Sequence, residues 1–72
     1  MKSTRAPAYR RFLTRLRSAR EDAGLTQVQV ARQLSRTQAF VSKSESGDRR
    51  VDVIELKTFA RLYRKPVSYF LG

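Results

Sequence analysis

Apolar residues recur every three or four positions along most of this chain, which is the spacing of one face of an α-helix. The pattern starts at Tyr9 and predicts a first helix that ends at Gly24, a residue suited to a left-handed cap. The inner positions expected for this helix are Tyr9, Phe12, Leu13, Leu16, Arg20 and Ala23. Residues 1–8 lack the pattern, so we predict a flexible basic arm at 1–8 and a single domain at 9–72.

Two short helices joined by a tight turn are predicted between Thr26 and Gly47. Thr26 can cap the first of them, with Gln29 three residues later as its partner in a capping box. Thr37 can cap the second, and Gly47 ends it. The inner positions expected for the pair are Val30, Ala31, Leu34, Val41 and Ser44.

The rest of the chain predicts two further helices. Asp52 can cap the fourth helix in a capping box with Glu55, and its expected buried stripe is Val53, Leu56, Phe59, Ala60 and Tyr63. Pro66 disfavours a helical conformation at Lys65 and can itself open a short fifth helix. No strand-like alternation is present, so the predicted fold is all-α, with five helices.

Charge is the strongest feature of the composition. Sixteen Lys and Arg face six Asp and Glu, which gives a net charge of +10 and indicates a polyanion as the partner. The 72 residues contain no Cys and no His, so we expect no metal, no cofactor and no enzymatic activity. Without an apolar run of about 18 residues, a cytoplasmic location is expected.

Two short helices joined by a turn, in so basic a chain, indicate a helix-turn-helix that places its second helix in the major groove of DNA. A phosphate path would run past both ends of that helix. Arg36, Arg49 and Arg50 flank it, and we expect them to contact the DNA backbone.

Beyond these patterns, the sequence resembles the lambda-repressor-like helix-turn-helix family of the Cro and phage-repressor type, often called the XRE family. The matching pieces are Leu16-Arg17, Arg20, Ala23 to Gln27, Val30-Ala31, Leu34, Gln38, Val41 to Lys43, Glu45, Gly47, Glu55-Leu56, Ala60, Pro66 and Tyr69 to Leu71. The resemblance implies a compact five-helix domain that binds operator DNA, usually as a two-fold dimer.

The same resemblance assigns roles to individual residues. It implies that Gln38, Ala39, Phe40 and Lys43 face base edges, that Gln27 and Ser46 contact phosphates, and that Arg20 and Glu45 form a salt bridge. Ser42 is a further candidate for the DNA backbone. Several positions depart from the family pattern. Ser35 stands where glycine is usual, Arg36 and Ser44 stand where apolar residues are more common, and Arg64-Lys65 replaces a usual small-apolar pair at the end of the fourth helix.

The C-terminal turn crowds several apolar side chains together, and we expect Val67 and Phe70 to form a dimer contact there. The predicted function is that of a sequence-specific DNA-binding transcriptional regulator, most simply a repressor that binds a palindromic operator as a homodimer, encoded by a bacterium or a phage and associated with the nucleoid. Two alternatives stay open. One is an antitoxin or protein-binding adaptor that autoregulates through DNA, and the other is an unspecific polycation for RNA or membranes.

Overall fold

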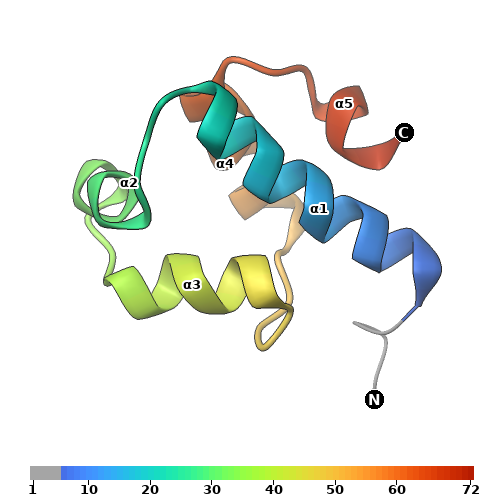
Figure 1. The fold of residues 1–72 in the computed structure, drawn as a ribbon, viewed down its shortest axis with the longest axis horizontal. Coiled ribbons are helices and arrows are strands. Elements are labelled where there is room, and N and C mark those ends of the chain that lie inside the picture. The colour runs from blue at the N-terminus through green and yellow to red at the C-terminus, as the bar shows by residue number, and fades with distance from the viewer. Residues whose placement is uncertain (1–5) are drawn as a thin grey trace.

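Five helices form the fold over residues 6–72, the part of the chain that this computed structural model describes. They are α1 (Pro7–Asp22), α2 (Gln27–Leu34), α3 (Gln38–Ser46), α4 (Val53–Tyr63) and α5 (Val67–Leu71). In Figure 1, α1 crosses the molecule, α3 lies along the lower edge, and α5 lies on the other side of α1. The predicted all-α architecture of five helices is confirmed.

The first helix begins earlier than predicted. It starts at Pro7, two residues before Tyr9, and the preceding Ala6 is its N-cap. Proline suits this place because the first turn of a helix needs no donor from its backbone nitrogen and because its φ is already helical. Residues 7 and 8 of the predicted arm are therefore helical, and residues 1–5 lie outside the described residues.

The predicted capping residues begin α2, α3 and α4. Thr26 and Gln29 form a reciprocal capping box, in which Oγ1 of Thr26 accepts from the Gln29 amide at 3.1 Å. Asp52 and Glu55 form the second box, and the Asp52 carboxylate accepts from the Glu55 amide at 2.7 Å. Thr37 accepts from the Phe40 amide at 3.1 Å. These caps are confirmed, and they fix where each helix starts.

Two non-glycine residues end helices in the left-handed conformation. Ser35 has φ 56° after α2, and Arg64 has φ 60° after α4. In each case the next amide returns to a carbonyl of the helix: Arg36 N donates to Ala31 O at 2.8 Å, and Lys65 N donates to Ala60 O at 3.0 Å. The departure noted at Ser35 is thus absorbed by a standard helix ending, although a side chain in this conformation costs about 1–2 kcal/mol.

Side chains from all five helices form one buried cluster. Its members are Phe12, Leu16, Ala19, Val30, Ala31, Val41, Leu56, Phe59, Ala60, Tyr63 and Phe70. Two predicted inner positions are wrong, since Ala23 is exposed beyond the end of α1 and Val53 is 67% exposed in the first turn of α4. Ala19 was not predicted, yet it is fully buried because it lies one turn after Leu16 on the same face.

The departure from the family pattern at Ser44 places a polar side chain in the core. Ser44, a polar residue under α3, is fully buried, and its hydroxyl donates to the Phe40 carbonyl at 2.7 Å. The helix backbone thereby satisfies the hydrogen-bonding capacity of the serine hydroxyl inside the core.

Phe70 is 1% exposed and packs beside Phe12, with 6.5 Å between ring centroids. The side chain has almost no free surface in the single chain, and its predicted place in a dimer contact stays a prediction.

Tyr63 provides a test of this core. Its side chain is buried, and its hydroxyl has no hydrogen-bond partner among residues 6–72, a burial that raises the pKa of the phenol well above its ordinary value. We expect Tyr63→Phe to raise the free energy of unfolding by about 1 kcal/mol, because it removes a buried polar group that makes no bond. Urea unfolding measures this change.

Tyr9→Phe is the matched control, since the Tyr9 hydroxyl accepts from the Val51 amide at 3.0 Å. Loss of this hydrogen bond should lower the free energy of unfolding by about 1 kcal/mol. A similar decrease for Tyr63→Phe would show that the Tyr63 hydroxyl has a partner after all.

Candidate nucleic-acid interface

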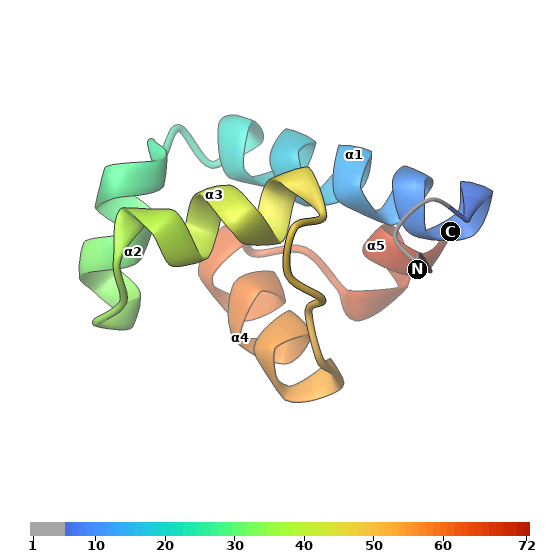
Figure 2. The same ribbon diagram turned by 90° about the horizontal axis from the view of Figure 1, so that it is seen from below.

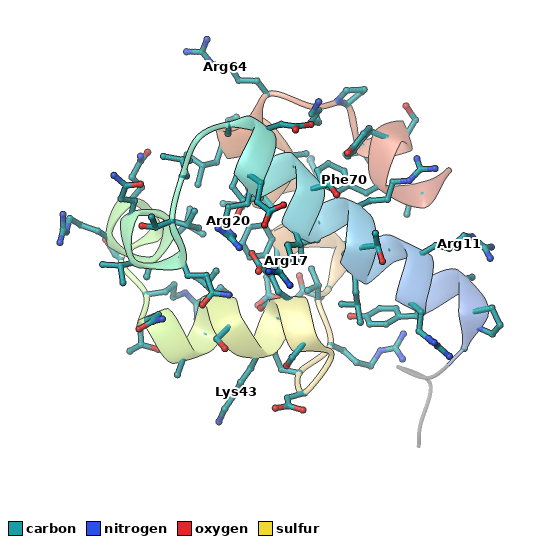
Figure 3. All side chains as sticks on the ribbon, in the orientation of Figure 1. Arg11, Arg17, Arg20, Lys43, Arg64 and Phe70 are labelled. Carbon is teal, nitrogen blue, oxygen red and sulfur yellow. The ribbon has the colours of Figure 1, made fainter. Side chains whose placement is uncertain are left out.

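The outward face of α3 carries most of the residues predicted to read bases. Gln38, Ala39 and Lys43 are exposed on it, and Ser42 is half-buried. Lys43 points away from the body of the domain (Figure 3), and α3 lies across the front of the molecule when it is seen from below (Figure 2). The side chains of Gln38, Ala39 and Lys43 are therefore accessible to a large partner.

A short hydrogen-bond chain joins the start of α2 to both ends of α3. Nε2 of Gln38 donates to Oε1 of Gln27 at 3.4 Å, and Nε2 of Gln27 donates to Oε1 of Glu45 at 3.0 Å. The side-chain amide of Gln27 is thus engaged inside the protein. Gln27 is also the first residue of α2, and the backbone N–H groups at the start of a helix have no acceptor within the helix. Those amides can bind a phosphate oxygen while the side chain orients Gln38.

An ion pair fastens α3 to α1. Nε of Arg20 lies 2.6 Å from Oε2 of Glu45, and Nη2 lies 3.2 Å from Oε1, so the contact is bidentate. The two side chains are only 11% and 6% exposed. Nη1 of Arg20 also donates to the Leu25 carbonyl at 2.9 Å, and the hydrogen bond with Glu45 raises the pKa of the guanidinium. One buried arginine thereby holds α1, the α1–α2 turn and α3 together.

Phe40 faces α4 and not the outward surface of α3. Its half-buried ring stacks on Phe59, with 6.2 Å between centroids and 20° between planes. The guanidinium groups of Arg36 and Arg49 each lie 4.4 Å from the centroid of the Phe40 ring. This packing engages part of the Phe40 ring inside the protein, and its expected role in reading bases stays a prediction.

Arg49 is held by the protein itself. Nη1 and Nη2 donate to the two carboxylate oxygens of Glu55 at 2.9 Å each, and Nη1 also donates to Oγ of Ser44 at 3.3 Å. Three of the five guanidinium N–H donors of Arg49 are thus used inside the protein. Its expected contact with the DNA backbone stays a prediction. Glu55 was predicted only as a capping residue, and its spacing of six residues from Arg49 gave no helical signal for the pair.

The remaining predicted backbone contacts lie near the ends of α3 in the chain. Arg36 is exposed in the turn before α3, and Ser46, the last residue of α3, is exposed as well. The Ser46 hydroxyl accepts from the Asp48 amide and donates to the Lys43 carbonyl, at 3.3 Å each. Arg50 is exposed beyond this turn, with its guanidinium 4.9 Å from the centroid of the Tyr9 ring.

Two other kinds of site are absent from residues 6–72. No group of three or more His, Cys, Asp or Glu there could hold a metal ion. No helix in this part of the chain is both long and apolar enough to span a bilayer.

A family model described as a helix-turn-helix domain matches residues 11–67, a range that contains α2, α3 and α4 entirely. Comparison with curated proteins found no match. Comparison with solved structures also found none.

The buried ion pair gives the first prediction for this site. We expect Glu45→Ala to lower the free energy of unfolding by about 3–5 kcal/mol, because it leaves the Arg20 guanidinium buried without its partner. Urea unfolding followed by circular dichroism measures the change. Glu21→Ala is the control, since the Arg17–Glu21 pair is exposed on α1 and should contribute less than about 1 kcal/mol. Equal losses in the two variants would contradict a structural role for the buried pair.

The Arg49–Glu55 pair gives a prediction about pH. Hydrogen bonds from Arg49 are the largest cause of a lowered pKa at Glu55, whose ordinary value is 4.5. A carboxylate whose pKa is lower in the folded state contributes stability above its unfolded pKa, and this stability is lost as the pH falls through the folded pKa. We therefore expect Glu55→Gln to be less stable than the parent at neutral pH and to lose less stability between neutral pH and acid. Urea unfolding at a series of pH values tests this, and parallel profiles would refute it.

Proposed function

We propose that this chain, which belongs to the helix-turn-helix domain family, is a sequence-specific DNA-binding regulator that places α3 in the major groove. The observation that carries the proposal is the charge of the exposed face of α3. Glu45, the one acidic residue in Gln38–Ser46, is turned inward onto Arg20. The outward face thus presents polar and basic groups and no carboxylate to DNA.

Base reading falls to three side chains in this proposal. Gln38 can pair bidentately with an adenine, Lys43 can donate to N7 and O6 of a guanine, and Ala39 can contact a thymine methyl group. The hydrogen bond from Gln38 to Gln27 supports the first assignment, since it limits the rotamers of Gln38 before DNA arrives.

Affinity comes from contacts with phosphates. Arg36 and Arg50 lie on either side of α3 in the chain, and Ser42, Ser46 and the first amides of α2 add neutral donors. The net charge of +10 attracts the duplex over a longer range.

The finer part of the proposal is a repressor of the lambda-repressor-like type that binds a palindromic operator as a dimer. It would act without catalysis in the cytoplasm of a bacterium, encoded there or by a phage. Two recognition helices would then lie one DNA turn apart, about 34 Å. A groove of about 540 Å³ supports the dimer, because Val67, Val53 and Leu71 line it and the last two are strongly exposed. Phe70 lines the same groove, with its side chain largely buried.

The same apolar groove favours one alternative, an antitoxin or adaptor that covers it with a different protein and regulates its own gene through DNA. Co-purification of a stable complex with the product of a neighbouring gene would distinguish this alternative from the homodimer.

Selection of bound sites from random duplex DNA at near-physiological salt tests the proposal. We expect enrichment of a palindrome whose half-sites are about 10 base pairs apart. Gln38→Ala should relax the preference at one position of each half-site and weaken binding by about 1–3 kcal/mol, because it removes one bidentate contact. Arg61→Ala is the control, since Arg61 lies on α4 and should leave the motif unchanged. Failure to enrich any motif would refute sequence-specific binding, and an asymmetric motif would refute the dimer.

A further inference from the structure

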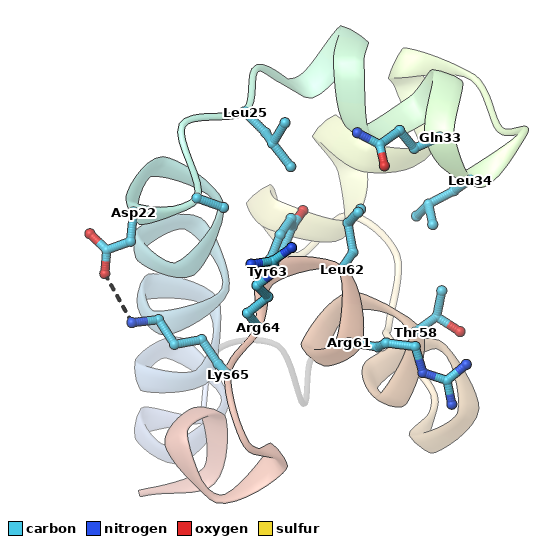
Figure 4. Close-up of a pocket in the computed structure, with 11 residues that line it drawn as sticks. Asp22, Leu25, Gln33, Leu34, Thr58, Arg61, Leu62, Tyr63, Arg64 and Lys65 are labelled. Carbon is cyan, nitrogen blue, oxygen red and sulfur yellow. Dashed lines mark ion pairs between the residues drawn. The ribbon is translucent and has the colours of Figure 1, made fainter.

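A second groove lies on a different side of the domain from the outward face of α3. Its volume is about 820 Å³, and the α1–α2 turn, the end of α2 and the C-terminal half of α4 form its walls (Figure 4). Arg64 belongs to this groove, and in Figure 3 it points in the direction opposite to Lys43. A molecule bound here would therefore leave the proposed DNA-reading residues uncovered.

The groove combines apolar and basic residues. Leu25, Leu34 and Leu62 are half-buried and line it from three different segments. Arg61, Arg64 and Lys65 supply three positive charges, and Asp22 supplies the one negative charge among the lining residues. Asp22 pairs with Lys65 at 3.3 Å, so its charge is already offset.

The two arginines have no such partner. Within residues 6–72, neither the Arg61 nor the Arg64 guanidinium makes a hydrogen bond or an ion pair, and both residues are exposed. Basic residues after a helix often serve only to offset the helix dipole. Arg64, however, adopts the left-handed conformation that favours glycine, and no contact of its side chain compensates for that backbone cost.

We propose that this groove binds an acidic, leucine-containing segment of another protein. Carboxylates of the segment would pair with Arg61 and Arg64, while its apolar side chains would cover Leu25, Leu34 and Leu62. The part of α4 in the groove, from Thr58 to Tyr63, is about 8 Å long. That length fits two apolar side chains at positions i and i+4 of an amphipathic helix, which are about 6 Å apart.

Charge complementarity and the leucines together select this occupant over nucleic acid. A phosphate backbone would satisfy the arginines, but it has no apolar group with which to cover the leucines. An acidic amphipathic segment satisfies both. The chain would then connect bound DNA with an acidic partner, although occupancy of the groove does not depend on DNA binding.

The probe for this proposal is a fluorescein-labelled peptide of about 14 residues, built to form a helix with leucines at i and i+4 between glutamates. It is titrated into the 15N-labelled protein. Amide shifts should concentrate at Leu25, Leu34, Leu62 and their neighbours. A second peptide with serine in place of each leucine should bind at least about tenfold more weakly, because it cannot cover the apolar floor. Equal binding of both peptides, or shifts spread over other basic surfaces, would overturn the proposal.

Two double variants separate the groove from the overall charge. Arg61→Glu with Arg64→Glu should weaken binding of the leucine peptide by at least about tenfold, because it reverses both rim charges. Arg10→Glu with Arg11→Glu makes the same change in net charge on exposed positions of α1 and should change the affinity by less than about twofold. Equal losses would show attraction by net charge alone.

A random-sequence DNA duplex completes the experiment. Addition of this duplex should leave the peptide bound, and it should not shift the groove amides when it is added to the protein without peptide. If the duplex displaced the peptide from the groove of the unsubstituted protein, this surface would be assigned to nucleic acid, and the proposal would also be overturned.

Discussion

The position of α3 depends on the buried ion pair between Arg20 and Glu45. A carboxylate near the C-terminal end of a helix opposes the helix dipole, so Glu45 needs the arginine that faces it in order to stabilise the fold. Arg20 also binds the Leu25 carbonyl, and Glu45 also accepts from Gln27. The same two residues therefore set the angle of α3 against α1, anchor the start of α2 and clear negative charge from the face proposed to bind DNA.

A second set of contacts holds the other side of α3. Phe40 stacks on Phe59 of α4, and Arg49 covers the same Phe40 ring while it pairs with Glu55. Arg49 additionally reaches Ser44 beneath the helix. The loop after α3 is thus tied to α3 and to α4 at once. A helix of nine residues is thus held from α1 on one side and from α4 on the other.

Positive charge is divided by task in this small domain. Arg20 and Arg49 are tied to carboxylates inside the fold, whereas Lys43 and Arg36 are exposed on or beside α3. Arg61 and Arg64 belong to a different surface, which Leu25, Leu34 and Leu62 also line. Net charge alone cannot make this division, because arginine fits a buried carboxylate, an aromatic ring and a phosphate equally well.

The sequence by itself determined the five helices, their capping residues and the helix-turn-helix, because caps, glycines and helical periodicity are local signals between residues a few positions apart. Resemblance to a family supplied the Arg20–Glu45 pair, which no local pattern predicts across 25 residues. Only the tertiary structure decided that Phe40 and Arg49 face α4, that Phe70 is internal and that Val53 is exposed. Each of these outcomes depends on which neighbouring helix covers a given face, and the chain records that only through contacts between distant residues.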